Sequence, residues 1–192
     1  EVENVPPHKP CADGPQAPQT ECKLKRHTMF SAKTYAARRN MLRTKIGSGI
    51  ILLPGNSLSP NNYPNNAYYF RQDSSFRYYF GLNTPSLAGL IDADTGEEAL
   101  YGDDFTVEDI IWTGPQPTLR ELGAEVGVTA TFPMAELEKR LRKAVSLGRK
   151  IHYLPPYRGE TKLQLSALLG IKPELLHDYK SVELMFAVAE MR

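Results

Sequence analysis

The sequence predicts an α/β domain in which helices flank a central, mixed β-sheet. Short apolar runs alternate along the chain with segments of helical pattern, as they do in layered α/β domains. Residues 50–53, Ile-Ile-Leu-Leu between Gly49 and Pro54, are typical of a strand buried on both faces. A hairpin is expected around Asp94-Thr95-Gly96, whereas helices join the other strands, so the sheet should contain both antiparallel and parallel pairs.

The first half of the chain contains a helix, a buried strand and an unusual aromatic segment. A helix is expected over residues 31–46, because the segment is rich in Ala, Arg, Met and Leu and stops before Gly47. Residues 55–66 are heavy in Asn, Ser and Pro and predict a loop long enough to be functional. Residues 68–81 hold seven aromatic side chains, which predict a strand at residues 68–70 followed by a short helix.

The short helix of this aromatic segment has clear end signals. Asp73 or Ser74 is expected to cap its first turn, and Gly81 is expected to end it. Phe76, Tyr79 and Phe80 are spaced i, i+3 and i+4, so they should share one face of the helix.

The second half of the chain continues the alternation. The hairpin strands are expected at residues 86–92 and 97–101, and capping boxes at Thr106 and Thr118 predict two helix starts. Leu137, Leu141 and Val145 predict the buried stripe of a following helix. The remaining elements are strands at residues 128–132 and 150–154 and helices at 135–147, 160–169 and 181–192.

Composition excludes several classes of protein. A chain of 192 residues, 41% of them hydrophobic, can bury one sizeable core. The net charge of +1 gives no long-range field toward nucleic acid or an anionic membrane, so neither is expected as a partner. No apolar run could span a bilayer or serve as a signal peptide, so the sequence predicts a soluble, cytoplasmic protein. Both cysteines, Cys11 and Cys22, fall in residues 1–28, a proline-rich segment that we interpret as a disordered leader or an added extension.

Acidic residues near the hairpin are the first candidates for chemistry. A hard cation prefers carboxylate ligands, which leaves a stand-alone carboxylate-metal hydrolase or nuclease-like domain as an alternative function. Turn formation is the stronger explanation of Asp94-Thr95-Gly96, and the calcium-loop pattern fails because its glycine is misplaced and its distal Glu is absent. The acidic residues concerned are Asp92, Asp94, Glu97, Glu98, Asp103 and Asp104.

Two further patterns have structural explanations. The histidines have no metal-ligand spacing, and His152, alone in a predicted strand, is expected to be structural. Arg71 and Arg77 among aromatic rings could form an RNA-stacking surface, but the chain lacks the glycine-punctuated RNP pattern and a basic surplus. No catalytic residue is therefore predicted in this chain.

Several motifs resemble the N-terminal domain of the aminopeptidase P and prolidase family, most closely that of bacterial Xaa-Pro aminopeptidases. The resemblance rests on Pro54-Gly55-Asn56, on the aromatic-Arg-Gln-Asp-Ser-Ser-Phe motif at residues 70–76, and on Gly81-Leu-Asn-Thr-Pro85. Ile111-Trp-Thr-Gly114 and His152-Tyr-Leu-Pro-Pro-Tyr-Arg158 also match. The resemblance implies an α/β domain at residues 29–180, with residues 181–192 beginning a linker helix to a catalytic domain.

The resemblance also implies a function for the whole protein. Family members remove the N-terminal residue that precedes proline, and two metal ions, commonly manganese, lie in the later catalytic domain. The metal-ligand motifs of that domain are not in this sequence, so this chain alone is expected to be inactive and to hold no cofactor. What it would contribute is substrate gating and the assembly of a homo-oligomer that acts on short proline-containing peptides.

The resemblance assigns roles residue by residue. Trp112 matches a tryptophan that reaches toward a neighbouring subunit's active site, although on sequence alone core packing is an equal alternative. Asn65 and Asn66 match entrance positions where relatives can carry an acid, so the two are expected to help gate the substrate without charge. A structural signature is expected from Arg71, Gln72, Asp73, Ser74, Phe76 and Gly81, with Arg71 pairing with Asp73 or a loop carbonyl.

Overall fold

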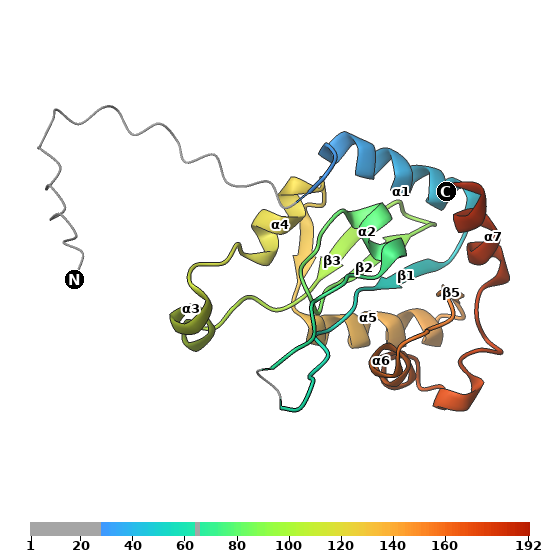
Figure 1. Cartoon of the computed structure of the whole chain (residues 1–192). Coiled ribbons are helices and arrows are strands. Elements are labelled where there is room, and N and C mark those ends of the chain that lie inside the picture. Colours follow the sequence, from blue (N-terminus) through green and yellow to red (C-terminus); the bar gives the residue numbers. More distant parts are fainter. Residues whose placement is uncertain (1–27, 64–65) are drawn as a thin grey trace, which may run out of the picture.

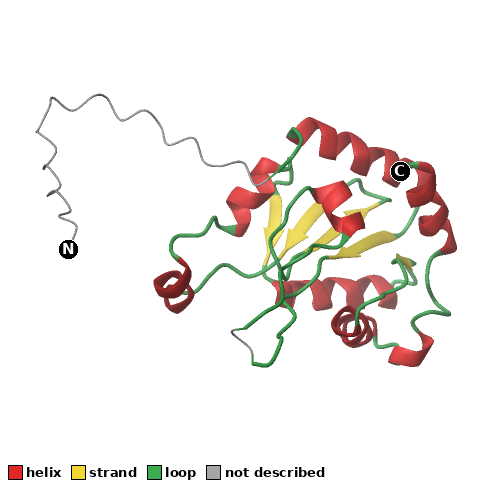
Figure 2. Cartoon of the chain, viewed as in Figure 1, coloured by secondary structure: helices red, strands yellow, loops and turns green. Residues whose placement is uncertain are grey.

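The computed structural model describes residues 28–63 and 66–192. They form three layers, in which a five-stranded mixed sheet lies between two layers of helices (Figure 1). Figure 2 shows the strands as the middle layer, with helices on both sides. The predicted fold class is confirmed.

The sheet has the strand order β4-β3-β2-β1-β5. The hairpin strands β2 (Ala88–Asp92) and β3 (Glu98–Tyr101) are antiparallel, and β2 is also antiparallel to β1 (Ile50–Pro54). The outer strands β4 (Ala130–Phe132) and β5 (Ile151–His152) run parallel to β3 and β1, respectively. Because β1 has a neighbour on each side and helices on both faces, its first four residues are buried, as predicted.

One face of the sheet is covered by α1 (Ala32–Ile46), α2 (Ser74–Phe80), α4 (Leu119–Glu125) and α7 (Val182–Glu190). Ile51 and Leu53 of β1 point into this core, whereas Ile50 and Leu52 point into the core on the other side, as the period of two requires. Side chains that the four helices bury in the first core include Tyr35, Phe76, Leu122 and Leu184.

Glycines allow α2 to pack closely against its neighbours. Gly81 ends α2 with φ 73°, and a Cβ atom there would lie 2.3 Å from the Tyr35 ring. A Cβ atom on Gly89 of β2 would lie 2.1 Å from the Phe80 ring. The aromatic face of α2 therefore rests directly on the backbone of the sheet.

The other face is covered by α5 (Met134–Ser146), α6 (Gly159–Leu169) and a 3₁₀ turn, η1 (Pro173–Leu175), which the sequence did not predict. Leu137 and Leu141 of α5 are buried, as predicted. The prediction for Val145 is wrong: it is 52% exposed, and Ala144 is buried instead. The helix presents positions 137, 141 and 144 to the sheet, and the next residue is turned away by about 100°.

Two strand predictions need correction. Residues 68–70 form no strand in the described structure; only Ala67 forms an isolated bridge, with Pro60. β2 and β5 occupy both sides of β1, so residues 68–70, which follow the loop, cannot pair with β1. The strand predicted at residues 150–154 is reduced to β5, because only Ile50 and Ile51 pair with it.

The remaining helix, α3 (Val107–Thr113), projects from the body of the domain (Figure 1). None of its residues is buried. Within the described ranges, no helix is long and apolar enough to cross a membrane.

Candidate functional site

The signature segment, which is the motif at residues 70–76, is held in place by the buried side-chain amide of Gln72. Gln72 Oε1 accepts hydrogen bonds from the backbone N–H groups of Asn56 (2.6 Å) and Asp73 (2.8 Å), and Gln72 Nε2 donates to the carbonyl of Thr84 (2.7 Å). Gly55 fits beside it because a Cβ atom there would lie 2.7 Å from the carbonyl of Leu87 and 3.0 Å from the Gln72 amide. Gln72 therefore joins three loops at the end of β1.

The residues on either side of Gln72 have different roles. Asp73 Oδ1 accepts from the N–H groups of Ser75 (2.9 Å) and Phe76 (2.8 Å), so Asp73 is the N-cap of α2. The pairing predicted between Arg71 and Asp73 is wrong: among the described residues the Arg71 side chain has no ion pair, and its carbonyl accepts from Asn56 Nδ2 (2.9 Å).

The predicted entrance loop, residues 55–66, extends outward from the end of β1 (Figure 1). Its base is closed by the N–H of Tyr68, which donates to the carbonyl of Ser59 (2.9 Å). At its tip Asn66 Nδ2 donates to Asn62 Oδ1 (2.7 Å). Asn65, the other predicted gating residue of this loop, lies outside the described residues.

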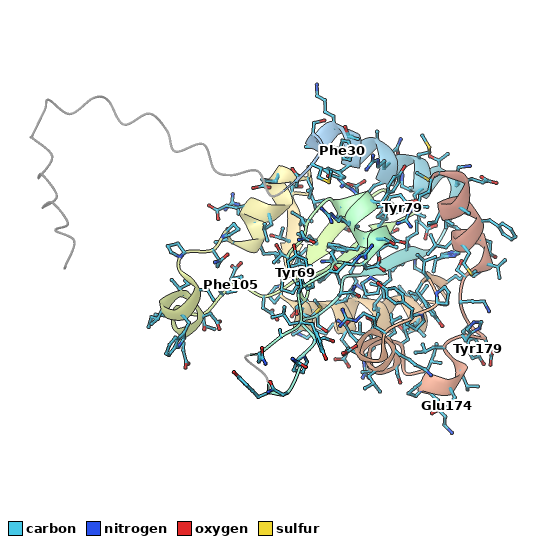
Figure 3. The ribbon with its side chains drawn as sticks, viewed as in Figure 1. Phe30, Tyr69, Tyr79, Phe105, Glu174 and Tyr179 are labelled. Carbon is cyan, nitrogen blue, oxygen red and sulfur yellow. The ribbon has the colours of Figure 1, made fainter. Side chains whose placement is uncertain are left out.

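Trp112 is on the exposed surface of α3, where it retains 83% of its accessible area. The core-packing alternative is therefore wrong. Thr106 and Asp109 form a capping box, with Thr106 N–H donating to Asp109 Oδ2 (2.9 Å), and the backbone at Gly114 (φ 75°) ends the helix. Local hydrogen bonds thus hold α3 in shape without any burial. Figure 3 labels Phe105 at the start of this projecting segment.

The six acidic side chains near the hairpin are already engaged, mostly by arginines. Arg149 binds both oxygens of Asp92 (2.6 and 2.9 Å) and also pairs with Asp94. Arg140 binds both oxygens of Glu97 (2.7 and 2.8 Å), and Arg39 binds Glu98 (2.7 Å). The two remaining acids accept backbone N–H groups, from Met134 to Asp103 and from Leu119 to Asp104.

These contacts argue against a metal centre. Burial by itself would raise the pKa of Asp92, but hydrogen bonds from Arg149, Thr95 and Asp94 outweigh it, and the pKa of Asp92 is lowered. Hydrogen bonds from Arg140 likewise lower the pKa of Glu97. Asp92 and Glu97 are thus each paired with a guanidinium through both carboxylate oxygens. In the part of the chain that the structure describes, no three His, Cys, Asp or Glu side chains are grouped as metal ligands would be.

Comparison with known proteins identifies the domain. A sequence model of the aminopeptidase P N-terminal domain matches residues 35–153. The chain belongs to this family. The match covers the sheet from β1 to β5 together with the signature segment and α3.

Solved structures of aminopeptidase P share the fold of this N-terminal domain. A low-pH form of the Escherichia coli enzyme has 18% identity and a TM-score of 0.62, over 73% of this chain and 33% of that chain. The zinc-substituted E. coli enzyme in complex with product has 17% identity and the Pseudomonas aeruginosa aminopeptidase PepP 20%, each with a TM-score of 0.62 over 78% of this chain and 34% of the other. This chain thus spans about a third of the length of these structures. None of the curated proteins with which it was compared matched.

The aminopeptidase P N-terminal domain also contains polar contacts that the sequence analysis missed. Asn56 is buried and Nδ2 donates to the Tyr157 hydroxyl (3.2 Å), which joins the loops that follow β1 and β5. Arg39 is fully buried on α1 and donates to the carbonyls of Tyr79 (3.0 Å) and Val126 (2.9 Å). The only sign of these contacts in the sequence was the motif that contains Asn56. The bonded residues are 40 to 101 positions apart in the chain, so they leave no local pattern.

The other candidates in this domain have structural roles. His152 lies between the Ser181 hydroxyl (Nδ1, 2.7 Å) and the Ser48 carbonyl (Nε2, 3.1 Å), and burial and the nearby Lys150 lower its pKa. The RNA-stacking surface loses most of its rings, because Phe76, Tyr79 and Phe80 are fully buried and only Tyr68 and Tyr69 remain exposed beside Arg71.

Proposed function

We propose that this chain is the non-catalytic N-terminal domain of a cytoplasmic Xaa-Pro aminopeptidase, comprising residues 29–180 and the start of a linker helix at 181–192. Its role is to gate substrate entry and to help assemble an oligomer. Membership of the family and the likeness to about a third of each solved aminopeptidase P chain support this proposal. The catalytic domain of the same protein is its first partner.

The observation that carries the gating role is the exposure of Trp112 on a projecting, capped helix. Val107 and Ile111 are 78% and 74% exposed on the same short helix. Apolar side chains gathered on a protruding surface are typical of sites that contact another protein or a ligand. An indole offers a flat apolar face that suits a proline ring, and α3 projects from the body of the domain, where another subunit would have access to it.

The entrance loop is the second part of this proposal. The Gln72 and Asn56 hydrogen bonds fix the base of the loop, whereas Asn66 lies near its tip. Asn65 and Asn66 would contact the peptide through amide groups, without a charge. Both the loop and Trp112 would restrict access to short proline-containing peptides.

The metal ions implied by the family do not fit this chain. Its acidic side chains near the hairpin are bound by arginines and backbone N–H groups, and these would have to be displaced. We therefore assign the two divalent ions, manganese in the family, to the catalytic domain alone.

The decisive experiment is Trp112→Ala in the full-length protein. We expect kcat/KM for Xaa-Pro peptides to fall by about tenfold, the loss of a transition-state contact worth about 1.4 kcal/mol. Sedimentation should also show a weaker oligomer, while the unfolding midpoint of the 192-residue domain alone stays the same because the side chain is exposed there. Tyr179→Ala, which removes an exposed aromatic far from α3, is the matched control. Unchanged kcat/KM and unchanged assembly would refute the gating role.

A further inference from the structure

A polar hollow lies where the loops after β1 and β5 separate. It has a volume of about 390 Å³, and we call it the arginine hollow. All of its lining residues are polar and none is acidic: Asn56, Arg71, Gln72, Ser74, Tyr157 and Arg158.

The topology of the sheet explains why the hollow is there. β1 and β5 are parallel neighbours, so their carboxyl ends lie at the same edge. The chain after β1 leads to α2 on one face of the sheet, whereas the chain after β5 leads to α6 on the opposite face. Adjacent parallel strands whose connections diverge in this way leave a crevice outside their carboxyl ends, which is where α/β sheets bind ligands.

The donors around the hollow are held in place before any ligand binds. Asn56 is fixed by its hydrogen bonds to the Arg71 carbonyl (2.9 Å) and the Tyr157 hydroxyl (3.2 Å). The guanidinium of Arg158 donates to the Ser57 carbonyl (3.3 Å) and to the Ser59 hydroxyl. Such preorganised donors lose little conformational entropy when an anion binds.

The charge of the hollow is unbalanced, in contrast to the other arginine-rich hollow of the domain. Under α5, Arg140 and Arg149 also line a hollow, but Glu97 and Asp92 pair with them. In the arginine hollow, Arg158 lies 3.5 Å from the exposed Glu160, and Arg71 has no ion pair among residues 28–63 and 66–192. One guanidinium is therefore available for an anion.

The surface beside the hollow is largely apolar, although Asp73 and Arg192 also line it. Tyr157, 72% exposed, and Ser74 line both the arginine hollow and an adjoining one of about 380 Å³. Leu154, Pro155 and Met185 line that second hollow. A ligand that spans both would carry an anionic group at one end and an apolar side chain next to it.

The geometry points to the C-terminal carboxylate of a short peptide as the ligand of the arginine hollow. The Arg71 guanidinium binds the carboxylate, with the Tyr157 hydroxyl as a further donor and the positive charge of Arg158 nearby, and the last side chain of the peptide lies in the adjoining hollow. A planar guanidinium matches a carboxylate with two parallel hydrogen bonds. This inference rests on the proposed function for the choice of peptides, and it adds a reason why short peptides with a free terminus would be preferred.

Direct binding to this chain tests the inference without any hydrolysis. The peptide Ala-Pro-Leu is titrated as the free acid and as the C-terminal amide, by calorimetry and by NMR of the arginine Nε–H groups. We expect the amide to bind at least about tenfold more weakly, and Arg71→Gln to weaken the free acid by a similar factor. Arg120→Gln, a change to an exposed arginine on α4, should leave binding unchanged.

Other outcomes would overturn the inference. Equal binding of acid and amide, or undiminished binding by Arg71→Gln, would show that the carboxylate is not recognised there. Inorganic phosphate that binds as tightly as the peptide would make the hollow a general oxyanion site. Because Arg158 also holds the loop, Tyr157→Phe serves as a second variant, with an expected loss of a few-fold in affinity. The kinetic test of Trp112 does not depend on any of these results.

Discussion

Two short helices of this domain, α2 and α3, are built from the same local signals and end in opposite environments. Each has seven residues, a side-chain N-cap and a glycine C-cap, and each carries aromatic or large aliphatic side chains. α2 buries Phe76, Tyr79 and Phe80 completely, whereas α3 buries nothing and leaves Trp112 in solvent.

The comparison teaches that capping defines a helix but not its role. α2 packs on the sheet at Gly89 and beside Tyr35 of α1 at Gly81, so its aromatic side chains contribute to the core. α3 is kept helical by its capping box, so its apolar side chains remain available to another molecule. A buried helix of this kind contributes stability, and an exposed one presents a surface.

The largest expected effect is on the buried side of this comparison. Phe76 stacks on Phe80 with ring centroids 5.3 Å apart, and Phe76→Ala would leave a cavity in the core. We expect the free energy of unfolding to fall by about 3–5 kcal/mol. Trp112→Ala is the control and should change it by less than about 0.5 kcal/mol. Both free energies are measured by urea unfolding. A similar loss of unfolding free energy in the two variants would mean that Trp112 is packed in the domain and not exposed.

A smaller effect is expected from Gln72, which fixes the approach to α2. Gln72→Ala would leave two buried N–H groups and one carbonyl without their partner, at about 1–3 kcal/mol for each group that stays unsatisfied. Since water can reach part of this site, we expect a total loss of about 2–4 kcal/mol. The exposed Gln116 beside α3 makes one hydrogen bond, to the Thr113 carbonyl, and is the matched control. An effect of Gln72→Ala no larger than that of Gln116→Ala would contradict the assigned role.

The smallest effect concerns the pH dependence of α3. Hydrogen bonds from the Thr106 hydroxyl and N–H lower the pKa of Asp109, so the helix is favoured while Asp109 is ionised. This contribution is complete above the ordinary pKa of an aspartic acid and is lost as the pH falls through the lowered value. Amide shifts of residues 107–113 should follow this titration, and Asp109→Asn should abolish it. A midpoint at or above the ordinary value would refute the capping interpretation.

Sequence patterns were most informative where a residue and its partner lie within one turn. Asp73, Thr106 and Thr118 cap their helices as predicted, and the hairpin forms around Asp94-Thr95-Gly96. The strand predicted at residues 68–70 was wrong because a strand there would need a free side of β1, and β2 and β5 occupy both sides. Val145 was misplaced because its spacing from Leu141 fitted a stripe that α5 does not direct at the sheet.

The candidate site was less predictable than the fold. Trp112 could be named from its motif, but its burial could not, since nothing within α3 distinguishes a core helix from a projecting one. The Arg71 pairing was misjudged because Asp73 is used by the N–H groups of α2. Tyr157 and Asn56 come together from positions 101 residues apart.

By itself, the sequence determined the alternation of helices and strands, the ends of the helices and the signature segment that marks the family. These depend on hydrophobic period and on hydrogen bonds between residues a few positions apart, which the chain order already contains. Only the tertiary structure decided that α2 is buried and α3 projects, and that two arginines from distant loops line one hollow that has no acidic lining residue. Such outcomes depend on which strands become neighbours in the sheet, and that arrangement is fixed by contacts between segments that are far apart in the chain.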